Sequence, residues 1–107
     1  MVTYEVNLHV EKEIAEQFKQ WLTEHIEHIL NYQGFIQATI SEFNTLPDLE
    51  IDDIECLTVS YQVDSMENLQ HYLDNHAKLM RDDGIKHFGE RFQAARRILS
   101  NQQTITS

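Results

Sequence analysis

Most of the basic side chains in this sequence lie in one short segment. Six of the eight lysines and arginines fall between residues 78 and 97, whereas fifteen of the eighteen acidic residues precede residue 78. The six are Lys78, Arg81, Lys86, Arg91, Arg96 and Arg97. A guanidinium presents a planar set of donors that can bind a carboxylate or a phosphate through two hydrogen bonds. The segment therefore predicts a site for a small anion; the alternative is that its charges pair with the chain's own carboxylates.

Arg91 and Arg96 are the arginines that we select as ligands of such an anion. Arg96 and Arg97 are adjacent in the sequence, and adjacent residues of a β-strand face opposite sides of a sheet. Only one of these two can therefore point into an internal site, and the sequence leaves open which one.

His76 is the candidate for general acid–base chemistry. It lies in an apolar stripe between Leu73 and Met80, where a polar ring needs a hydrogen-bond partner. One interpretation is a packed histidine that is satisfied within the protein; the other is a general base or a ligand contact. An enzyme would hold His76 in a partly apolar pocket beside a second polar group, whereas a binding module would hydrogen-bond the ring to backbone and have no cavity.

Other candidate residues do not form a recognisable site. His25 and His28 lie three residues apart on a predicted helix, where they could share a metal ion, but no third ligand accompanies them. The acidic segment 48–55 lacks the glycine and the spacing of a calcium-binding loop. Cys56, the single cysteine, has no motif of a nucleophilic thiol around it. The sequence therefore predicts no metal site and no bound cofactor.

Composition limits the classes of protein to consider. The chain has 107 residues, which fits one domain, and 41% of them are hydrophobic, which is enough for a core. A net charge of −10 argues against a nucleic-acid partner, because phosphate contacts need a basic stripe. No apolar run approaches the length of a membrane-spanning helix, so no membrane association is expected and a cytoplasmic location is predicted.

The first half of the chain predicts two strands that flank a helix. Residues 2–10 alternate between apolar and polar, residues 12–32 have the spacing of an amphipathic helix, and residues 35–43 form a second alternating run. In this second strand, Phe35 is expected on the opposite face from Ile36. Residues 44–53 contain the only proline and predict an acidic loop.

The second half repeats the pattern in the order strand, helix, strand. Residues 54–63 predict a strand, residues 65–82 a helix with Asp64 or Ser65 as its N-terminal cap, and residues 91–100 a last strand. Residues 1–100 are thus expected to form a single ferredoxin-like α+β domain of βαββαβ order, with a four-stranded antiparallel sheet and two helices on one face. The polar residues 101–107 predict a flexible tail.

The opposite face of this sheet would be open and of mixed character. Its expected residues are Thr3, Glu5, Asn7, His9, Phe35, Gln37, Thr39, Ser41, Phe43, Cys56, Thr58, Ser60 and Gln62. The face is too mixed for free solvent and too polar for a dry core. Two such sheets packed face to face would form a homodimer with a partly polar interior.

A pattern in the C-terminal third carries a family resemblance. Its residues are Tyr72, Leu73, His76, Ala77, Leu79, Arg81, Gly84, Phe88, Gly89, Arg91, Phe92, Ala94, Arg96 and Leu99. With the order of elements, they resemble the dimeric α/β-barrel superfamily and, more closely, a family of short bacterial proteins known only as a domain of unknown function. The resemblance implies a barrel-type dimer in a bacterial cytoplasm, and it carries over no catalytic residue to this sequence. The wider superfamily includes cofactor-independent monooxygenases, haem-degrading enzymes, muconolactone-isomerase-like enzymes and ligand-sensing domains.

The resemblance to haem-degrading barrels adds one candidate residue. Those proteins pair an asparagine on the first strand with a helical histidine, which Asn7 and His76 match loosely. They also use a tryptophan on the second helix, whereas the only tryptophan here, Trp21, lies on the first. Asn7 therefore joins the candidate ligand-binding residues, and haem chemistry is not predicted.

The resulting hypothesis is a homodimeric, non-catalytic ligand-binding or interaction module with a small-anion site near His76, Arg91 and Arg96. The alternative is a small enzyme of oxygenase or isomerase type without a tightly bound cofactor. It would act in the barrel interior with His76 as base and Arg96 as anion clamp. A third hypothesis, a structural dimer that recruits another protein, requires a large exposed apolar patch.

Overall fold

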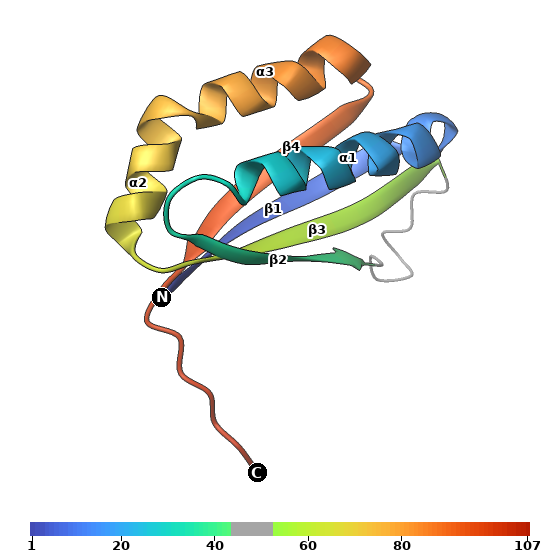
Figure 1. Cartoon of the computed structure of the whole chain (residues 1–107). Helices are drawn as coiled ribbons and strands as arrows, with labels where there is room; N and C mark the ends of the chain where they lie inside the picture. The colour runs from blue at the N-terminus through green and yellow to red at the C-terminus, as the bar shows by residue number, and fades with distance from the viewer. Residues whose placement is uncertain (44–52) are drawn as a thin grey trace.

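The computed structural model describes residues 1–43 and 53–107 as an α+β fold (Figure 1). Its elements are β1 (Val2–Glu11), the short 3₁₀ helix η1 (Lys12–Ile14), α1 (Ala15–Ile29), β2 (Phe35–Glu42), β3 (Ile54–Val63), α2 (Met66–Asn75), α3 (Ala77–Phe88) and β4 (Phe92–Leu99). The predicted acidic loop lies outside the described residues, apart from Asp53.

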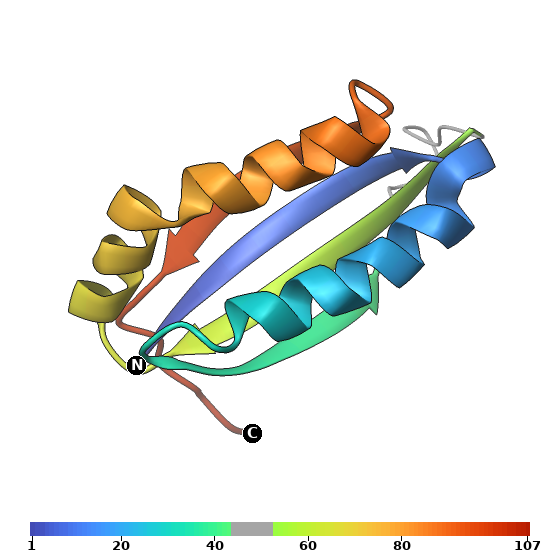
Figure 2. The same ribbon diagram turned by 45° about the horizontal axis from the view of Figure 1, so that its top comes forward.

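The strands form one antiparallel sheet in the order β2-β3-β1-β4. All three α-helices lie on the same side of this sheet (Figure 1), and Figure 2 shows α1 and α3 running along it with β1 between them. The predicted ferredoxin-like fold with an open second face is confirmed. In the described ranges, no helix combines the length and the apolar character that crossing a membrane requires.

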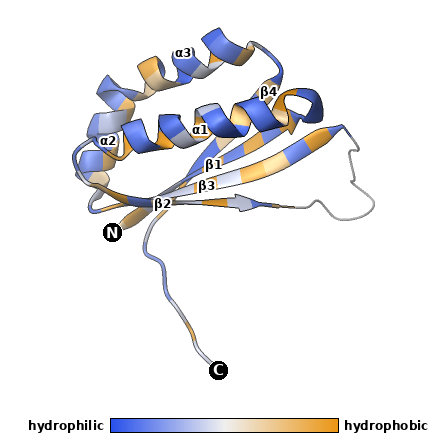
Figure 3. Ribbon diagram, turned by 45° about the vertical axis from the view of Figure 1, so that its right-hand side comes forward, coloured by the Kyte–Doolittle hydropathy of each residue, from blue (hydrophilic) through white to orange (hydrophobic). Residues whose placement is uncertain are grey.

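Side-chain alternation along the strands separates a buried helix side from a mixed open side. Figure 3 shows this alternation along β3. The helix side of the two central strands forms the middle of the core: Tyr4, Leu8, Val10, Leu57, Val59, Tyr61 and Val63. The apolar stripe of α1 covers these residues with Phe18, Leu22, Ile26 and Ile29. The stripe has helical spacing and the strands have period two, so both surfaces can bury their apolar residues against each other.

The prediction that Phe35 lies on the open face is wrong. Phe35 pairs with Val63 and Gln37 pairs with Gln62, so a bulge at Ile36 shifts the register by one residue. A one-residue shift moves a side chain to the other face. Phe35 is consequently buried on the helix side, with its ring 5.0 Å from that of Tyr72.

The second predicted helix consists of two helices and is longer than expected. Its N-terminal cap is Ser65, whose Oγ accepts a hydrogen bond from the N–H of Asn68 at 3.2 Å. The helix breaks at His76, which has φ −129° and ψ −28°, and α3 then continues to Phe88. The break turns the chain so that α3 can run along the sheet (Figure 2).

Gly84 lies inside α3, although the sequence suggested that it follows the helix. A Cβ at this position would come within 3.0 Å of the Trp21 ring and 3.3 Å of the Phe92 ring. The missing side chain therefore lets α3 approach α1 and β4 closely.

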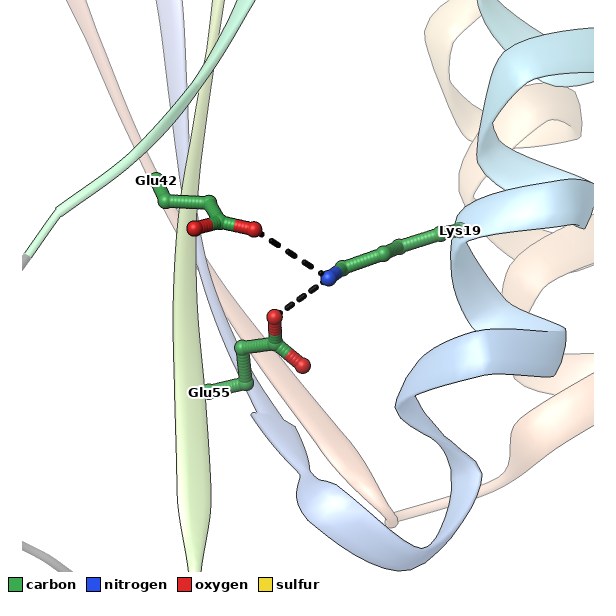
Figure 4. A network of polar contacts seen from close by, with 3 residues as sticks. All are labelled: Lys19, Glu42 and Glu55. Carbon is green, nitrogen blue, oxygen red and sulfur yellow. Dashed lines mark hydrogen bonds and ion pairs between the residues drawn. The ribbon is translucent and has the colours of Figure 1, made fainter.

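The end of α1 that follows η1 is tied to the sheet by Lys19. Its ammonium group contacts Glu55 of β3 and lies 3.3 Å from a carboxylate oxygen of Glu42 on β2 (Figure 4). The hydrogen bond to Glu55 is the main cause of a raised pKa of Lys19. The three side chains help to hold α1 above β2 and β3.

Candidate functional site

A cavity of about 650 Å³ lies between the sheet and the helices α1 and α3. Its helical walls include Phe18, Trp21 and His25 from α1 and Met80, Arg81 and Gly84 from α3. Its floor includes Tyr4, Val6, Val59 and Tyr61 from the central strands and Phe92, Ala94 and Arg96 from β4. A cavity of this size with apolar walls and a few polar groups is typical of a small-molecule site.

Two aromatic clusters bound the cavity along β1. Near Leu8, the ring of Phe18 lies 5.0 Å from Phe92 and 5.4 Å from Trp21. Near the start of β1, Tyr4 stacks on Tyr61 at 5.8 Å. These separations are those of favourable aromatic pairs. The aromatic clusters therefore form rigid apolar walls.

The three tyrosines that line the cavity, Tyr4 and Tyr61 from the sheet and Tyr72 from α2, are neutral phenols. Burial raises the pKa values of Tyr4, Tyr61 and Tyr72 above the ordinary value for tyrosine. The positive charge of Arg96 opposes this effect at all three. These residues consequently offer hydroxyl groups rather than charges to a molecule in the cavity.

Arg96 lies between the two aromatic clusters. It pairs with Val6 in the middle of β1, while Phe92 pairs with Val10 and Ile98 with Tyr4. Its side chain lines the cavity, as does that of Arg81. Neither guanidinium makes an ion pair with a carboxylate in residues 1–43 and 53–107. Both can therefore receive an anion.

Arg97 and Arg91 are engaged elsewhere. Arg97 faces the open side, where its Nε donates to Glu5 Oε1 at 2.7 Å. Arg91 donates to Glu11 Oε1 at 3.1 Å and to Glu13 Oε2 at 2.9 Å. Of the two neighbours, Arg96 is thus the one whose side chain lines the cavity, and Arg91 pairs with the chain's own carboxylates, which was the alternative to an anion site.

His76 and Asn7 do not join Arg96. His76 lies at the break between α2 and α3, where its ring stacks on Tyr32 at 4.3 Å, and it is not among the residues that line the cavity. Asn7 lies on the open side, where it donates to Glu5 at 3.1 Å and accepts a hydrogen bond from Thr58 at 2.7 Å. Of the four residues selected from the sequence, only Arg96 lines the cavity. A cavity is present but His76 does not line it, so the structure matches neither the enzyme with His76 in its pocket nor the binding module without a cavity that the sequence suggested.

His25 is the cavity residue that the sequence analysis considered only as a metal ligand. Its ring stacks on Trp21 at 4.4 Å, and its Nδ1 is buried without a hydrogen-bond partner. Burial is the main cause that lowers the pKa of His25 from 6.5 to about 4, and the nearby Asp83 carboxylate opposes the shift. The spacing from Leu22 to His25 and on to Ile29 placed this residue on the apolar stripe of α1, which was the available signal.

Two acidic residues lie beside the cavity. Asp83 accepts a hydrogen bond from Trp21 Nε1 at 3.0 Å, and His87 Nδ1 lies 3.6 Å from its other carboxylate oxygen. Glu90 contributes to the lining. The lining itself carries two arginines, one carboxylate and a neutral His25, so its own charge is positive, and the carboxylate of Asp83 lies next to it.

The model of a family described as "Domain of unknown function (DUF4286)" matches residues 1–102. Comparison with curated proteins gives no match. Among solved structures, a putative antibiotic biosynthesis monooxygenase from Deinococcus radiodurans is 15% identical, with a TM-score of 0.71 over 100% of this chain and 98% of that one.

Two further solved structures share the fold. SnoaB from Streptomyces nogalater, described as a cofactor-independent oxygenase, is 12% identical, with a TM-score of 0.63 over 99% of this chain and 98% of that one. A protein from an uncultured marine organism, described as a dimeric ferredoxin-like protein, is 16% identical, with a TM-score of 0.51 over 99% and 95%. At these identities the similarity establishes the fold alone.

Proposed function

The chain belongs to the family described as Domain of unknown function (DUF4286), and we propose that it is a homodimer that binds a small aromatic anion in the cavity between its sheet and its helices. Arg96 clamps the anionic group. The observation that carries the proposal is an aromatic cavity lined by Arg81 and Arg96, neither of which is paired with a described carboxylate.

The aromatic character of the ligand is supported by the walls. Phe18 and Phe92 at one end and Tyr4 and Tyr61 at the other line the cavity and form aromatic pairs there. Flat rings pack well against such surfaces, and the guanidinium of Arg96, an exposed residue at the cavity lining, can donate a charged hydrogen bond to an acidic group. An aromatic ring that carries a carboxylate satisfies both parts of the site.

The binding test uses a matched pair of compounds and a matched pair of variants. We expect 4-isopropylbenzoate to bind and its neutral analogue 4-isopropylbenzamide to bind more weakly, as measured by calorimetry. Arg96→Ala should lower the affinity for the benzoate about tenfold or more, because it removes a charged hydrogen bond. Arg97→Ala, which changes the neighbouring residue on the other face, should leave it unchanged. Equal losses in both variants, or no binding at all, would overturn the proposal.

The proposed homodimer forms through the open face of the sheet. Several polar groups of this face are already satisfied within it, since Asn7 bonds to Thr58 and Glu5 to Arg97. A face of this kind can be covered by a second copy without burying unpaired polar atoms. One structural neighbour is described as a dimeric ferredoxin-like protein, which supports a dimer of this fold.

The oligomeric state is tested by light scattering after gel filtration. Thr58→Glu would place a charge near the centre of the open face and should convert a dimer into a monomer. Lys78→Glu, on a side chain that is 83% exposed on α3, should remain dimeric. A monomeric native protein would refute the dimer, and a dimeric Thr58→Glu variant would refute the open face as its interface. The free Cys56 suits a reducing compartment, and we place the protein in the cytoplasm.

A second candidate function is an enzyme without a tightly bound cofactor. It is supported by Arg96, an exposed residue whose side chain contributes to the cavity lining, where a guanidinium can stabilise negative charge that develops on a reacting oxygen. One neighbour of the same fold is described as a cofactor-independent oxygenase. Incubation of phenolic acids with the protein in air and under nitrogen, followed by mass spectrometry, tests this function. Oxygen incorporation that Arg96→Ala abolishes would favour the enzyme over the binding module.

A further inference from the structure

His25 presents two different nitrogens to its surroundings. Nδ1 is enclosed by protein and has no hydrogen-bond partner. His25 lines the cavity, and of its two ring nitrogens only Nδ1 is found buried without a partner among the described residues. Nε2 is therefore the nitrogen that a molecule in the cavity can reach.

The unpartnered Nδ1 determines where the ring proton resides. A neutral imidazole carries one N–H donor and one acceptor nitrogen. Buried N–H groups without an acceptor are rarer in proteins than acceptors that lack a donor. A proton on Nδ1 would create such a donor, so the favoured tautomer carries its proton on Nε2 and leaves a bare lone pair on Nδ1.

Nearby acidic groups do not change this state. Asp83 is the carboxylate that favours a charged His25, but its Oδ2 already accepts the hydrogen bond from Trp21 Nε1 at 3.0 Å. His28 and Arg96 oppose a positive charge on the ring, and burial opposes it most. His25 is thus a neutral donor at physiological pH, which permits a hydrogen bond to an oxygen without a second positive charge in the site.

We propose that Nε2–H of His25 donates a hydrogen bond to an oxygen of the bound ligand, which is therefore an aromatic acid with a second oxygen acceptor, such as a carbonyl group. This inference rests on the proposed function, because Arg96 holds the acidic group while His25 recognises the other oxygen. The two side chains come from α1 and β4, so they select a ligand that extends from the helical wall to the sheet.

The tautomer is tested without any ligand. Long-range ¹H–¹⁵N correlation spectra distinguish a protonated from an unprotonated ring nitrogen, and the His25 signals are assigned by their loss in His25→Gln. We expect a protonated Nε2 and a bare Nδ1 between pH 6 and pH 8. A proton on Nδ1, or a fully protonated ring in this range, would overturn the inference.

The recognition of the second oxygen is tested with compounds of matched shape. The acetyl groups of 3- and 4-acetylbenzoate carry an acceptor oxygen, and 3- and 4-isopropylbenzoate replace it with a methyl group. We expect one acetyl compound to bind about tenfold more tightly than its isopropyl partner, because a donor left unpaired in an apolar site weakens binding. Equal affinities within both pairs would contradict the proposal.

Two variants of His25 distinguish which of its two ring nitrogens donates the hydrogen bond. The amide nitrogen of Gln reaches the place of Nε2, whereas that of Asn reaches the place of Nδ1. His25→Gln should keep most of the preference for the acetyl compound, and His25→Asn should lose it. The isopropyl compounds, which have no acceptor, should bind both variants equally. A preference that survives in His25→Asn would exclude His25 as the donor.

The tests distinguish failure of this inference from failure of the proposed function. If Arg96→Ala weakens binding of every benzoate but the His25 variants bind the acetyl and isopropyl compounds like the native protein, the anion site stands and the role of His25 is refuted. If no benzoate binds and the spectra nevertheless show the Nε2 proton, the proposed function fails while the assigned tautomer stands.

Discussion

Arginine residues on the two sides of the sheet have opposite environments. On the open side, Arg97 lies 2.7 Å from Glu5, directly across the strand pair. On the helix side, Arg96 lies between aromatic side chains and makes no ion pair with a carboxylate of the described residues. A step of one residue along β4 thus separates a structural charge from a charge that can bind a ligand. The comparison shows that position on the sheet, more than local sequence, decides what an arginine does.

The largest expected difference between the sides concerns stability. Phe18 is fully buried among Trp21, Phe88 and Phe92, and Phe18→Ala should lower the free energy of unfolding by about 3–5 kcal/mol. Ser60→Ala, on the open side, should change it by less than about 1 kcal/mol. Denaturation in urea at equal protein concentration measures both. Similar losses in the two variants would mean that the open side is as tightly packed as the helix side.

The next largest expected effect is a pH dependence of the free energy of unfolding, which arises from His25 on the helix side. Its pKa is lowered from 6.5 to about 4 in the folded protein, so below pH 6.5 the unfolded chain binds a proton that the folded protein does not. The contribution of His25 is therefore present above pH 6.5 and is lost as the pH falls toward 4, by up to about 3 kcal/mol.

His25→Gln isolates this contribution, because glutamine does not titrate. Between pH 7 and pH 5, the native protein should lose more stability than this variant, as measured by urea denaturation at each pH. Carboxylates shared by both proteins contribute equally to the two curves. Parallel curves would show that His25 titrates normally and is not shielded by the cavity.

A smaller effect is expected when the shape of the cavity is changed at Gly84. In Gly84→Ala, the new Cβ would press on the Trp21 ring at 3.0 Å, whereas alanine favours the helix by about 1 kcal/mol. We expect stability to change by less than about 1 kcal/mol, while the fluorescence of the single tryptophan shifts and 4-isopropylbenzoate binds more weakly. Gly89→Ala has a strained φ of +59° but no neighbour within 4 Å, and its fluorescence should stay native. An unchanged fluorescence spectrum in Gly84→Ala would show that the Trp21 ring accommodates the added Cβ without a change in its environment.

The smallest effect concerns the ion pair on the open side. The hydrogen bond from Arg97 is the main cause that lowers the pKa of Glu5 below 4.5. A lowered carboxylate pKa stabilises the fold above the ordinary pKa and ceases to do so as the pH falls through the folded value. Arg97→Ala should therefore cost less than about 1 kcal/mol at pH 7 and almost nothing at about pH 3. A cost that persists in acid would point to packing by the arginine stem instead.

Periodicity was sufficient to predict the fold but not the site. The strands and the helix stripe followed from apolar residues at period two and at helical spacing, and both were confirmed. Alternation also predicted that Arg96 and Arg97 face opposite ways. The assignment of Arg96 to the helix side needed its pairing with Val6, which depends on contacts far apart in the sequence. Register of this kind is set by tertiary packing.

The errors have local physical causes. Phe35 was placed on the wrong face because a single bulge residue, Ile36, is invisible to a periodic pattern. The helix break occurs at His76, and no glycine or proline at that position indicates it in the sequence. His25 was passed over because its role arises from enclosure, and burial of one ring nitrogen cannot be read from residue spacing.

The position of β1 has a consequence for how the protein is made. Of the four strands of this sheet, β1 is synthesised first and lies in the centre, and its partners are β3 and β4, with Tyr4 opposite both Tyr61 and Ile98. Translation must therefore reach the last strand before the apolar side of β1 has its neighbours, and contacts so distant along the chain form slowly. Because β4 also carries Arg96, a truncated or stalled chain would lack the clamp, and only a completely folded chain would acquire the capacity to bind.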